Sequence, residues 1–524
     1  MVIVIGSGPA GVSCAKALVG RGAEVTLLDA GIELEPERRA LVNELAGRRH
    51  QEWSQALHAE ARRQPPVELG GVPLKYSFGS AFPYRDVERL LPFENHGCAT
   101  RPTLARGGFS TVWGSAVLPY LAEDLADWPI AAGDLAAHYR AVTAWMPIAG
   151  VSDDLAGELP LHTEAPRPLA PSAQARALLA DLERRRERLQ RSGLRFGRSR
   201  LAVRAEADAR GPGCVYCQMC MHGCPYGLIY DASATLAELR RSGLRYVSGC
   251  VADRLVEGPR GVSVIGRSLA SGDAVRFEAE RVYLACGAVA TTRLLLASLE
   301  AFDRPVIMKD SQYFLLPLLR FRGVPAPRRE ALHTLAQLFL ELRHPAVGPR
   351  NVHLQVYGYS DLFEALFDRL LGPVARVVRP AVDALLSRML VIQGYLHSEL
   401  SPSIRVTLRR HGEFGTLVLE AQRNPLTRPS LRRVVRRLVR HAVDLRALPL
   451  APLLQIALAG RGFHSGGTFP MRASPSAFES DLLGRPHGFT RVHAVDATVF
   501  PTIPSTTITF TVMANAHRIA SLDA

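Results

Sequence analysis

The first thirty residues alternate short apolar runs with turns. Residues 2–5 are all apolar and are followed directly by the glycine-rich residues 6–11. Residues 12–18 have the spacing of a buried helix, and residues 24–29 form a second apolar run that ends in an acid. Short apolar runs bounded by turns predict buried strands, and strands that alternate with helices predict a parallel sheet. We therefore predict a strand, a helix and a second strand.

The same alternation continues through the middle of the chain. Residues 281–288 form another buried strand that ends in glycine, and a helix begins after it at Thr291. Residues 150–175 are rich in proline, which predicts a surface loop. Further helices are predicted at residues 38–68, 134–142 and 232–241 and at the end of the chain up to Ala520, with short strands between residues 244 and 277.

Residues 305–460 have a different character. Apolar helical segments alternate there with strand-like segments at residues 351–357, 404–408 and 416–420, and the last two predict a hairpin around His411 and Gly412. Residues 430–446 have apolar positions at helical spacing with arginines on the other face. We predict a separate sheet with helices, covering something apolar.

The glycines after the first strand have the spacing of a dinucleotide-binding turn. Gly6 allows the tight turn, Gly8 lets the backbone approach a pyrophosphate, and Gly11 permits close packing of the helix, whose N-terminus favours negative charge. Asp29, which ends the second strand, can accept a hydrogen bond from an adenosine ribose hydroxyl. The strand, the glycines, the helix and the acid together predict a dinucleotide site.

A second glycine pair precedes small and aromatic residues. Gly107 and Gly108 are followed by Phe109 and Ser110, and such a stretch can bring backbone amides close to a planar ring. A plain turn is the alternative interpretation of this segment.

Four cysteines stand in one short run closed by proline. Cys214, Cys217, Cys220 and Cys224 are separated by two, two and three residues, and Pro225 follows. This spacing is typical of thiolates that hold one iron–sulfur cluster. A structural zinc site and disulfides are the alternatives, but zinc ligands usually come as two separated pairs. The other four cysteines divide into Cys14 and Cys286, expected in the core, and Cys98 and Cys250, which are reserve ligands.

Composition and charge narrow the class of protein. The 524 residues allow two or three domains, and 21% charged with 47% hydrophobic residues argue against disorder. The net charge of +14 is mostly arginine, and no nucleic-acid motif accompanies it. The arginine face of residues 430–446 predicts a solvated surface or a contact with an acidic protein, an anionic lipid or a phosphorylated substrate.

The start of the chain and its apolar runs predict a location. An apolar strand from Val2 leaves no room for a signal peptide, and no run is long enough to span a bilayer. Cysteines that are free to bind metal fit a reducing compartment. We expect a cytoplasmic protein, with association to a membrane surface left open.

With these motifs in place, the chain resembles the glucose–methanol–choline (GMC) family of flavin oxidoreductases. The resemblance runs from end to end. It rests on the glycine turn with Asp29, on Gly107 and Gly108, on the strand-to-helix segment 285–296, on the residues from His464 to Met471, and on Asp496 with the following Phe-Pro-Thr-x-Pro. The cysteine run resembles that of flavin sugar and polyol dehydrogenases that carry an iron–sulfur cluster.

The resemblance implies a fold and a division into domains. The fold class is α/β (α+β overall), with a Rossmann-type FAD-binding domain and an interleaved substrate domain built on a mixed or antiparallel sheet plus helices. The FAD-binding domain is expected at residues 1–130, 205–305 and 460–524 and carries the cysteine run at 205–230. The substrate domain is expected at residues 131–204 and 306–459.

The resemblance also implies roles for particular residues. His464 matches the histidine that accepts the proton of the alcohol while hydride moves to flavin N5, although alone it would be interpreted as a structural histidine. The partner position, a histidine or asparagine in the family, is Thr507 here, and His493 and Asn515 are the next residues to consider. The expected FAD contacts are Gly6, Gly8, Gly11, Asp29, Gly107, Gly108, Ser110 and Asp496.

The function expected from the sequence is an FAD-dependent dehydrogenase of a sugar, polyol or lipid-like alcohol. Electrons are expected to leave singly through an iron–sulfur cluster, [4Fe-4S] or else [3Fe-4S], to a protein acceptor such as a ferredoxin or cytochrome. No nucleic acid partner is expected. Two alternatives stay open, a reductase in which ferredoxin drives electrons toward the substrate and a noncatalytic redox-sensing flavoprotein.

Overall fold

The computed structural model describes residues 1–63, 68–69, 72–411 and 414–523. Its N-terminal part confirms the predicted strand, helix and strand as β1 (Val2–Ile5), α1 (Pro9–Gly20) and β2 (Val25–Leu28). These strands belong to a five-stranded sheet of order β22-β11-β1-β2-β7 in which all neighbours are parallel. The other strands are β7 (Arg245–Val247), β11 (Arg281–Leu284) and β22 (Val492–Ala494).

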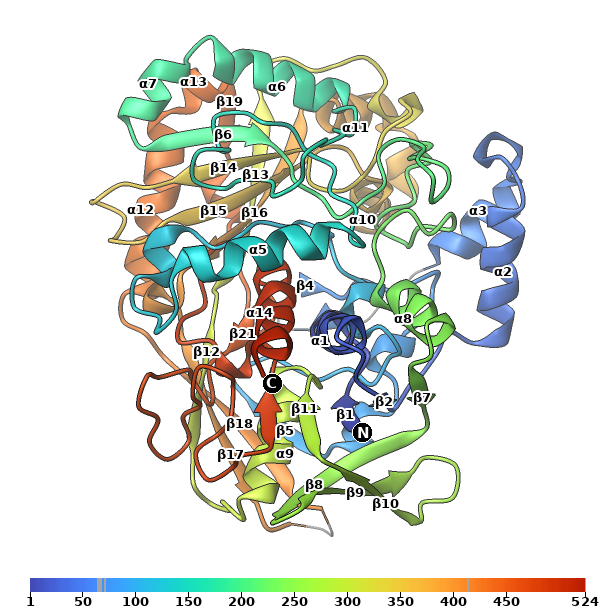
Figure 1. Cartoon of the computed structure of the whole chain (residues 1–524). Coiled ribbons are helices and arrows are strands. Elements are labelled where there is room, and N and C mark those ends of the chain that lie inside the picture. The colour runs from blue at the N-terminus through green and yellow to red at the C-terminus, as the bar shows by residue number, and fades with distance from the viewer. Residues whose placement is uncertain (64–67, 70–71, 412–413, 524) are drawn as a thin grey trace.

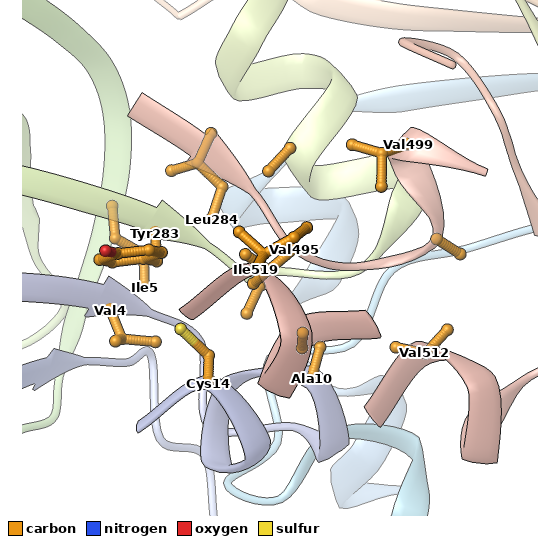
Figure 2. Close-up of a cluster of buried hydrophobic side chains, with 14 of the residues drawn as sticks. Val4, Ile5, Ala10, Cys14, Tyr283, Leu284, Val495, Val499, Val512 and Ile519 are labelled. Atoms are coloured by element: carbon orange, nitrogen blue, oxygen red, sulfur yellow. The ribbon is translucent and has the colours of Figure 1, made fainter. Parts of the chain in front are cut away.

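The core beneath this sheet joins the two ends of the chain. Helix α14 (Thr509–Leu522) packs against α1, and the Ser13 hydroxyl donates to the Met513 carbonyl at 2.8 Å. Figure 2 shows Cys14 of α1 and Val4 of β1 on one side of this cluster and Ile519 of α14 beside Val495. Cys14 is fully buried there, as expected for a core cysteine.

A small antiparallel sheet and two helices flank the parallel sheet. The sheet consists of β8 (Cys250–Gly258), β9 (Gly261–Ser268) and β10 (Ala274–Ala279). Helix α8 (Ala232–Arg241) has the bounds that the sequence predicts, and α9 (Ala288–Ser298) follows β11.

The upper half of Figure 1 is a seven-stranded sheet, whose paired strands are all antiparallel. Its order is β19-β13-β16-β15-β14-β6, with β20 paired to β13. The strands are β6 (Leu194–Arg198), β13 (Tyr313–Arg320), β14 (Leu338–Leu342), β15 (Val352–Tyr357), β16 (Met389–Leu396), β19 (Ala447–Pro449) and β20 (Gln455–Ile456).

A third large sheet connects segments that the predicted domain division separates. Its five strands run in the order β21-β12-β17-β18-β5, with β5 (Phe93–His96), β12 (Val306–Asp310), β17 (Ser403–Arg409), β18 (Thr416–Gln422) and β21 (Ser465–Gly466). Strands β17 and β18 confirm the predicted antiparallel pair, although residues 412–413 of its turn lie outside the described residues. The division into two domains stays a prediction.

Helices cover these sheets and fill the space between them. The long helix predicted at residues 430–446 is two helices, because His441 has a non-helical backbone between them. The helices are α2 (Pro36–Ala46), α3 (Gln55–Arg62), α4 (Val87–Leu90), α5 (Ala132–Thr143), α6 (Ala173–Glu183), α7 (Arg186–Arg191), α10 (Asp361–Leu371), α11 (Arg379–Leu386), α12 (Thr427–Arg440) and α13 (Ala442–Leu445).

Short 3-10 helices and one two-stranded ribbon complete the chain. The ribbon is β3 (Glu68–Leu69) with β4 (Val72–Pro73). The 3-10 helices are η1 (His50–Glu52), η2 (Phe82–Tyr84), η3 (Gly108–Thr111), η4 (Ala122–Leu125), η5 (Pro327–Arg329), η6 (Gly372–Arg376), η7 (Ser398–Leu400), η8 (Ala451–Leu453) and η9 (Ala497–Val499).

The expected α/β class is confirmed, since parallel and antiparallel sheets occur together with helices throughout. In the part of the chain that the structure describes, none of the helices has both the length and the apolar content needed to cross a bilayer.

Candidate active site

A cavity of about 1290 Å³ runs from the parallel sheet to the seven-stranded sheet. One end is lined by the turn between β1 and α1, by the end of β2 and by η3. The other end is lined by side chains of β13, β15, β16 and α10 and by His464. The cavity therefore joins the predicted dinucleotide site to the expected substrate region.

The glycine turn brings backbone close to backbone, as the sequence predicts. Gly6 has φ +102°, and a Cβ there would lie 2.5 Å from the Ala285 carbonyl oxygen. A Cβ on Gly11 would lie 1.9 Å from the Gly6 carbonyl oxygen. Contacts this short exclude any side chain. Gly6 and Gly8 line the cavity, whereas Gly11 acts behind them by letting α1 begin close to β1.

Asp29 lies in the cavity wall at the end of β2 and is buried. Its carboxylate accepts hydrogen bonds from the hydroxyls of Ser7 and of Tyr246, the latter at 3.1 Å. Burial raises the pKa of Asp29 to about 6, while these two hydrogen bonds act in the opposite direction. A carboxylate in this place can accept a hydrogen bond from a ribose hydroxyl. No sequence pattern indicates Ser7 or Tyr246 as its partners.

The second glycine pair lies directly opposite the first turn. A Cβ on Gly108 would approach the Gly8 Cα to 3.1 Å, and Gly107, at φ +88°, donates its N–H to Ser7 Oγ at 2.9 Å. Ser110 Oγ accepts from the Ala232 N–H at 2.9 Å and donates to the Gly107 carbonyl at 2.5 Å. The pair therefore narrows the cavity next to the glycine turn, and Ser110 ties it to the start of α8.

Asp496 is already saturated by protein donors. One carboxylate oxygen accepts from the Gly287 N–H at 2.9 Å and from the Thr291 hydroxyl at 2.5 Å, and the other accepts from the N–H and hydroxyl of Thr498. Asp496 lines the cavity and is buried, which raises its pKa. Its carboxylate holds the start of α9 against η9, so a ligand would meet a fixed wall here.

His464 lines the cavity at the substrate end. Its ring stacks on Tyr395 with centroids 4.8 Å apart and an angle of 26° between the planes. Its Nδ1 atom is buried, and no residue that the structure describes hydrogen-bonds to it. Burial lowers the pKa of His464 to about 4, and the neighbouring His353 acts in the same direction. The imidazole is therefore neutral at pH 7 and able to take up a proton.

Thr507 lies in the same cavity wall and is buried. Its Oγ1 accepts a hydrogen bond from the Leu118 N–H at 3.1 Å. Because a hydroxyl has one proton to donate and two lone pairs, this contact leaves the Thr507 proton for another acceptor. The structure thus brings His464 and Thr507, predicted from the sequence, to one cavity.

A chain of polar side chains on β14 and β15 reaches this end of the cavity. Glu341 contacts His353 Nδ1 at 2.6 Å, His353 Nε2 lies 3.2 Å from the Gln355 amide nitrogen, and the Tyr357 hydroxyl donates to Gln355 at 3.0 Å. Gln355, Tyr357 and Tyr395 line the cavity. No sequence motif indicates a role for any of these three residues. The alternation of side chains along the strand at residues 351–357 places Gln355 and Tyr357 on one face, but it does not indicate which cavity that face borders.

The two reserve candidates for proton transfer lie elsewhere. His493 stacks on Tyr283 in the core and its Nδ1 lies 2.9 Å from the Leu483 carbonyl. Asn515 is buried in α14, where its side-chain oxygen accepts from Arg518 at 3.0 Å. Neither residue lines the large cavity.

The four cysteines of the run line a second, smaller cavity of about 20 Å³. All eight cysteines are free thiols, so the run forms no disulfide. Burial raises the pKa of Cys214 to about 12 and that of Cys217 and Cys224 above the ordinary range, and the other thiols of the run add to each shift. Across the described residues, no three His, Cys, Asp or Glu side chains are grouped as a metal ion requires.

The cysteine run borders the large cavity as well. Met221, between Cys220 and Cys224, lines the large cavity, and so does Lys75. Lys75 donates to the Trp113 carbonyl at 2.8 Å and is close enough to Cys220 and Cys224 for their charges to oppose its pKa shift. Burial nevertheless lowers the pKa of Lys75 to about 8. The sequence carried no signal for Lys75.

The remaining cysteines are apart from the run. The Cys98 thiol donates to the Leu419 carbonyl at 3.3 Å, and the Cys250 thiol lies 3.8 Å from the Asp29 carbonyl oxygen. Neither lines the small cavity, so the structure gives no support to their use as reserve ligands. Cys286, expected in the core, packs against it but also lines the large cavity.

A Rossmann-type turn that faces a glycine pair, with a histidine at the far end of the same cavity, is typical of flavin-dependent oxidoreductases. Comparison with known proteins agrees with this class. Residues 94–301 match the family model for GMC oxidoreductases. The matched segment includes the second glycine pair and the cysteine run.

Solved structures extend the likeness to the whole fold. Pyridoxine 4-oxidase from Mesorbium loti has a TM-score of 0.59 at 15% identity, with 99% of this chain and 98% of that chain covered. A formate oxidase variant from Aspergillus oryzae has a TM-score of 0.59 at 14% identity, with 99% and 97% covered. At these identities the likeness shows the fold alone. No curated protein matches the sequence.

The residues present fit FAD. The glycine positions form a cradle that any Cβ would fill, and the Asp29 carboxylate lies in the wall where the ribose of a dinucleotide would bind. The residues that line the cavity extend from Asp29 to α10, so the cavity has room for both a dinucleotide and a substrate.

Proposed function

We propose that the protein oxidises the hydroxyl of an alcohol-type substrate to a carbonyl in the large cavity. The observation that carries this proposal is His464, a neutral imidazole in the cavity wall whose buried Nδ1 has no partner among the described residues. An unpaired buried ring nitrogen is costly unless a ligand satisfies it. The ring itself lies in the cavity wall, where a substrate hydroxyl can donate a hydrogen bond to a neutral imidazole.

In this proposal the alcohol loses its O–H proton to His464 and its C–H hydrogen as hydride. FAD, when bound, supplies the acceptor for the hydride. Tyr395 holds the His464 ring by stacking, and Thr507 can donate its free proton to the substrate oxygen and so orient it. Threonine is a poor base, so proton transfer is assigned to His464 alone.

The residues that line the cavity narrow the class of alcohol that fits. Gln355, Gln393 and Tyr357 offer hydrogen bonds near His464, which suits a sugar or polyol. Leu362 and Leu366 of α10 also line the cavity and suit an apolar substrate body. An anaerobic screen of sugars, polyols and long-chain alcohols for bleaching of the flavin absorbance tests the proposal. Bleaching by none of them, at any pH, contradicts it.

The same screen separates the two alternative functions. A reductase would show no bleaching by alcohols and would oxidise reduced flavin with a carbonyl compound, because its electrons run toward the substrate. A redox-sensing flavoprotein would turn over neither the alcohols nor the carbonyl compound. Both results exclude alcohol oxidation as the main activity.

We also propose that Cys214, Cys217, Cys220 and Cys224 hold an iron–sulfur cluster. The support is their spacing, their shared cavity, and the position of Met221, which carries the run to the wall of the flavin cavity. Such a cluster takes electrons one at a time and could pass them to a protein acceptor. Oxygen should then be a slow oxidant, and NAD should not serve as an acceptor.

Metal analysis tests this second proposal. Purified protein should contain iron and sulfide together with FAD, and Cys217→Ser should lose iron while FAD stays bound, because the glycine turn lies apart from the run. Cys98→Ser is the matched control, since Cys98 is buried but does not line the small cavity. Zinc without sulfide in the intact protein, or iron retained by Cys217→Ser as by the control, contradicts the cluster.

A further inference from the structure

Helix α10 and the following η6 present apolar side chains to solvent. Leu370, Val374 and Val377 are 69%, 55% and 81% exposed. An amphipathic surface helix normally turns polar residues outward, and contiguous exposed apolar residues mark a contact surface. We call Leu370, Val374 and Val377, with Arg369 and Arg376, the α10 surface.

The inner face of this segment is partly buried against the protein, on a different side from the exposed residues. Phe363, Phe367 and Leu371 of α10 contact a cluster that includes Val382 and Leu386 of α11. The segment therefore has apolar residues on two sides, one against the protein and one toward solvent.

Charge on the outward side is positive. The four acids of residues 361–386 all form ion pairs: Asp361 pairs with His222 and Arg62, Glu364 with Arg328 and Arg379, Asp368 with Arg379, and Asp383 with Arg328 and Arg379. Arg369 and Arg376 are exposed and form no ion pair with any described residue. The acids are thus neutralised by other basic residues, and two arginines stay free beside the exposed apolar ones.

The same helix forms part of the cavity wall. Leu362, Phe363 and Leu366 line the large cavity, and Leu366 is 40% exposed, so the cavity reaches solvent beside α10. A second apolar edge borders this end, because Gln455 of β20 lines the cavity and its neighbour Ile456 is 44% exposed.

We propose that the α10 surface docks on an anionic lipid bilayer and that an apolar alcohol enters the cavity from the bilayer beside α10. Leucine and valine side chains enter the interface, and the free arginines contact anionic head groups. A contact with an acidic protein would need only the arginines. Because exposed apolar residues stand beside the arginines, the surface favours a lipid bilayer. The entry of an alcohol rests on the proposed function; the docking itself does not.

Vesicle flotation of the FAD-loaded protein tests the docking without any turnover. The protein should float with vesicles that contain phosphatidylglycerol and much less with phosphatidylcholine alone. Arg369→Gln with Arg376→Gln should lower the vesicle partition coefficient, calculated from the floated fraction, by roughly fivefold for each charge removed. Leu370→Ser with Val377→Ser should lower it on the order of tenfold.

Helix α12 supplies the matched control. Arg432 and Arg436 are exposed and without an ion pair to any described residue, and Figure 1 shows α12 at the left edge of the molecule and α10 to the right of its centre. Arg432→Gln with Arg436→Gln removes the same charge and should leave flotation unchanged. A loss equal to that of the α10 variants would overturn the proposal, because binding would then follow total charge.

A fluorescence variant locates the contact. Val377→Trp should shift its emission to shorter wavelength when phosphatidylglycerol vesicles are added, relative to the parent protein. Absence of the shift, or failure of the parent protein to float, overturns the docking. If the apolar variants instead turn a dimer into a monomer in gel filtration and vesicles do not bind, the surface contacts a second copy and the proposal is wrong. Failure of the alcohol screen with normal flotation would overturn only the proposed function.

Discussion

At the end of the large cavity that lies on the parallel sheet, part of the wall is glycine backbone. Gly6, Gly8 and Gly108 line it, and a Cβ on Gly6 would lie 2.5 Å from the Ala285 carbonyl oxygen. At the other end the wall consists of side chains, among them His464, Tyr395 and Gln355. In a site made of backbone, substitution of one residue either blocks ligand binding or has no effect. In a site made of side chains, substitution of one residue lowers binding or rate by the contribution of that group.

The glycine turn offers the largest effect and a direct test of this difference. Gly11→Ala should abolish retention of FAD, because the new Cβ would lie 1.9 Å from the Gly6 carbonyl and push α1 away from β1. Gly20→Ala, at the other end of the same helix, is the control, since a Cβ there meets nothing within 4 Å. Flavin content after gel filtration measures both. FAD retained by Gly11→Ala would show that the turn is not a backbone cradle.

The substrate end should respond to loss of its base without loss of FAD. His464→Ala should slow flavin reduction by on the order of 10²–10⁴, the usual contribution of a positioned base. Anaerobic stopped-flow measurement with the alcohol found in the screen gives the rate. His487→Ala, an exposed histidine outside the cavity, should reduce at the parental rate. An unchanged rate in His464→Ala would move proton transfer to another group.

The pH dependence of flavin reduction sharpens the assignment to His464. A base acts only when deprotonated, and burial holds the pKa of His464 at about 4. The rate should therefore stay level from neutral pH down to about 5 and fall roughly tenfold per unit below the pKa. Brief pH-jump mixing avoids acid unfolding. The ordinary pKa of histidine is roughly 6.5. A midpoint of the rate profile between pH 6 and 7 would therefore indicate a solvated imidazole or a different base.

Thr507 should show the smallest effect of the four. Thr507→Val removes one hydrogen bond to the substrate oxygen, worth about 0.5–1.5 kcal/mol, so flavin reduction should slow by roughly two- to tenfold. Thr506→Val is the matched control, because the adjacent Thr506 is buried, does not line the cavity and has no partner for its hydroxyl among the described residues. A larger loss for Thr507→Val than for His464→Ala would reverse their assigned roles.

The same contrast explains how much could be predicted from the sequence. The glycine turn and its two strands were predicted correctly, because only glycine tolerates the contacts at Gly6 and Gly11. Tyr395 and Lys75 could not be predicted. Tyrosine fits any half-buried strand and lysine any surface, and only the pairing of distant segments brings them to the cavity.

The sheets show the same limit. The hairpin of β17 and β18 follows from alternation over a short distance, but the same sheet also pairs Phe93 of β5 with Leu417 and Ser465 of β21 with Asp310 of β12, which are far apart in the sequence. Long-range pairing of this kind leaves no local pattern in the sequence. Roles for the candidate site residues, predicted from their resemblance to the family, await the experiments above.

The closing of the core by α14 has a consequence for biosynthesis. Strand β22 borders β11, and α14 packs against α1, the helix that carries the glycine turn. A ribosome makes the glycine turn first and residues 492–522 almost five hundred residues later. Until then the turn lacks its supporting helix and β11 has an open edge. Binding of FAD at the turn therefore waits until residues 492–522 are made, and a nascent chain that lacks them exposes an open strand edge that chaperones must shield.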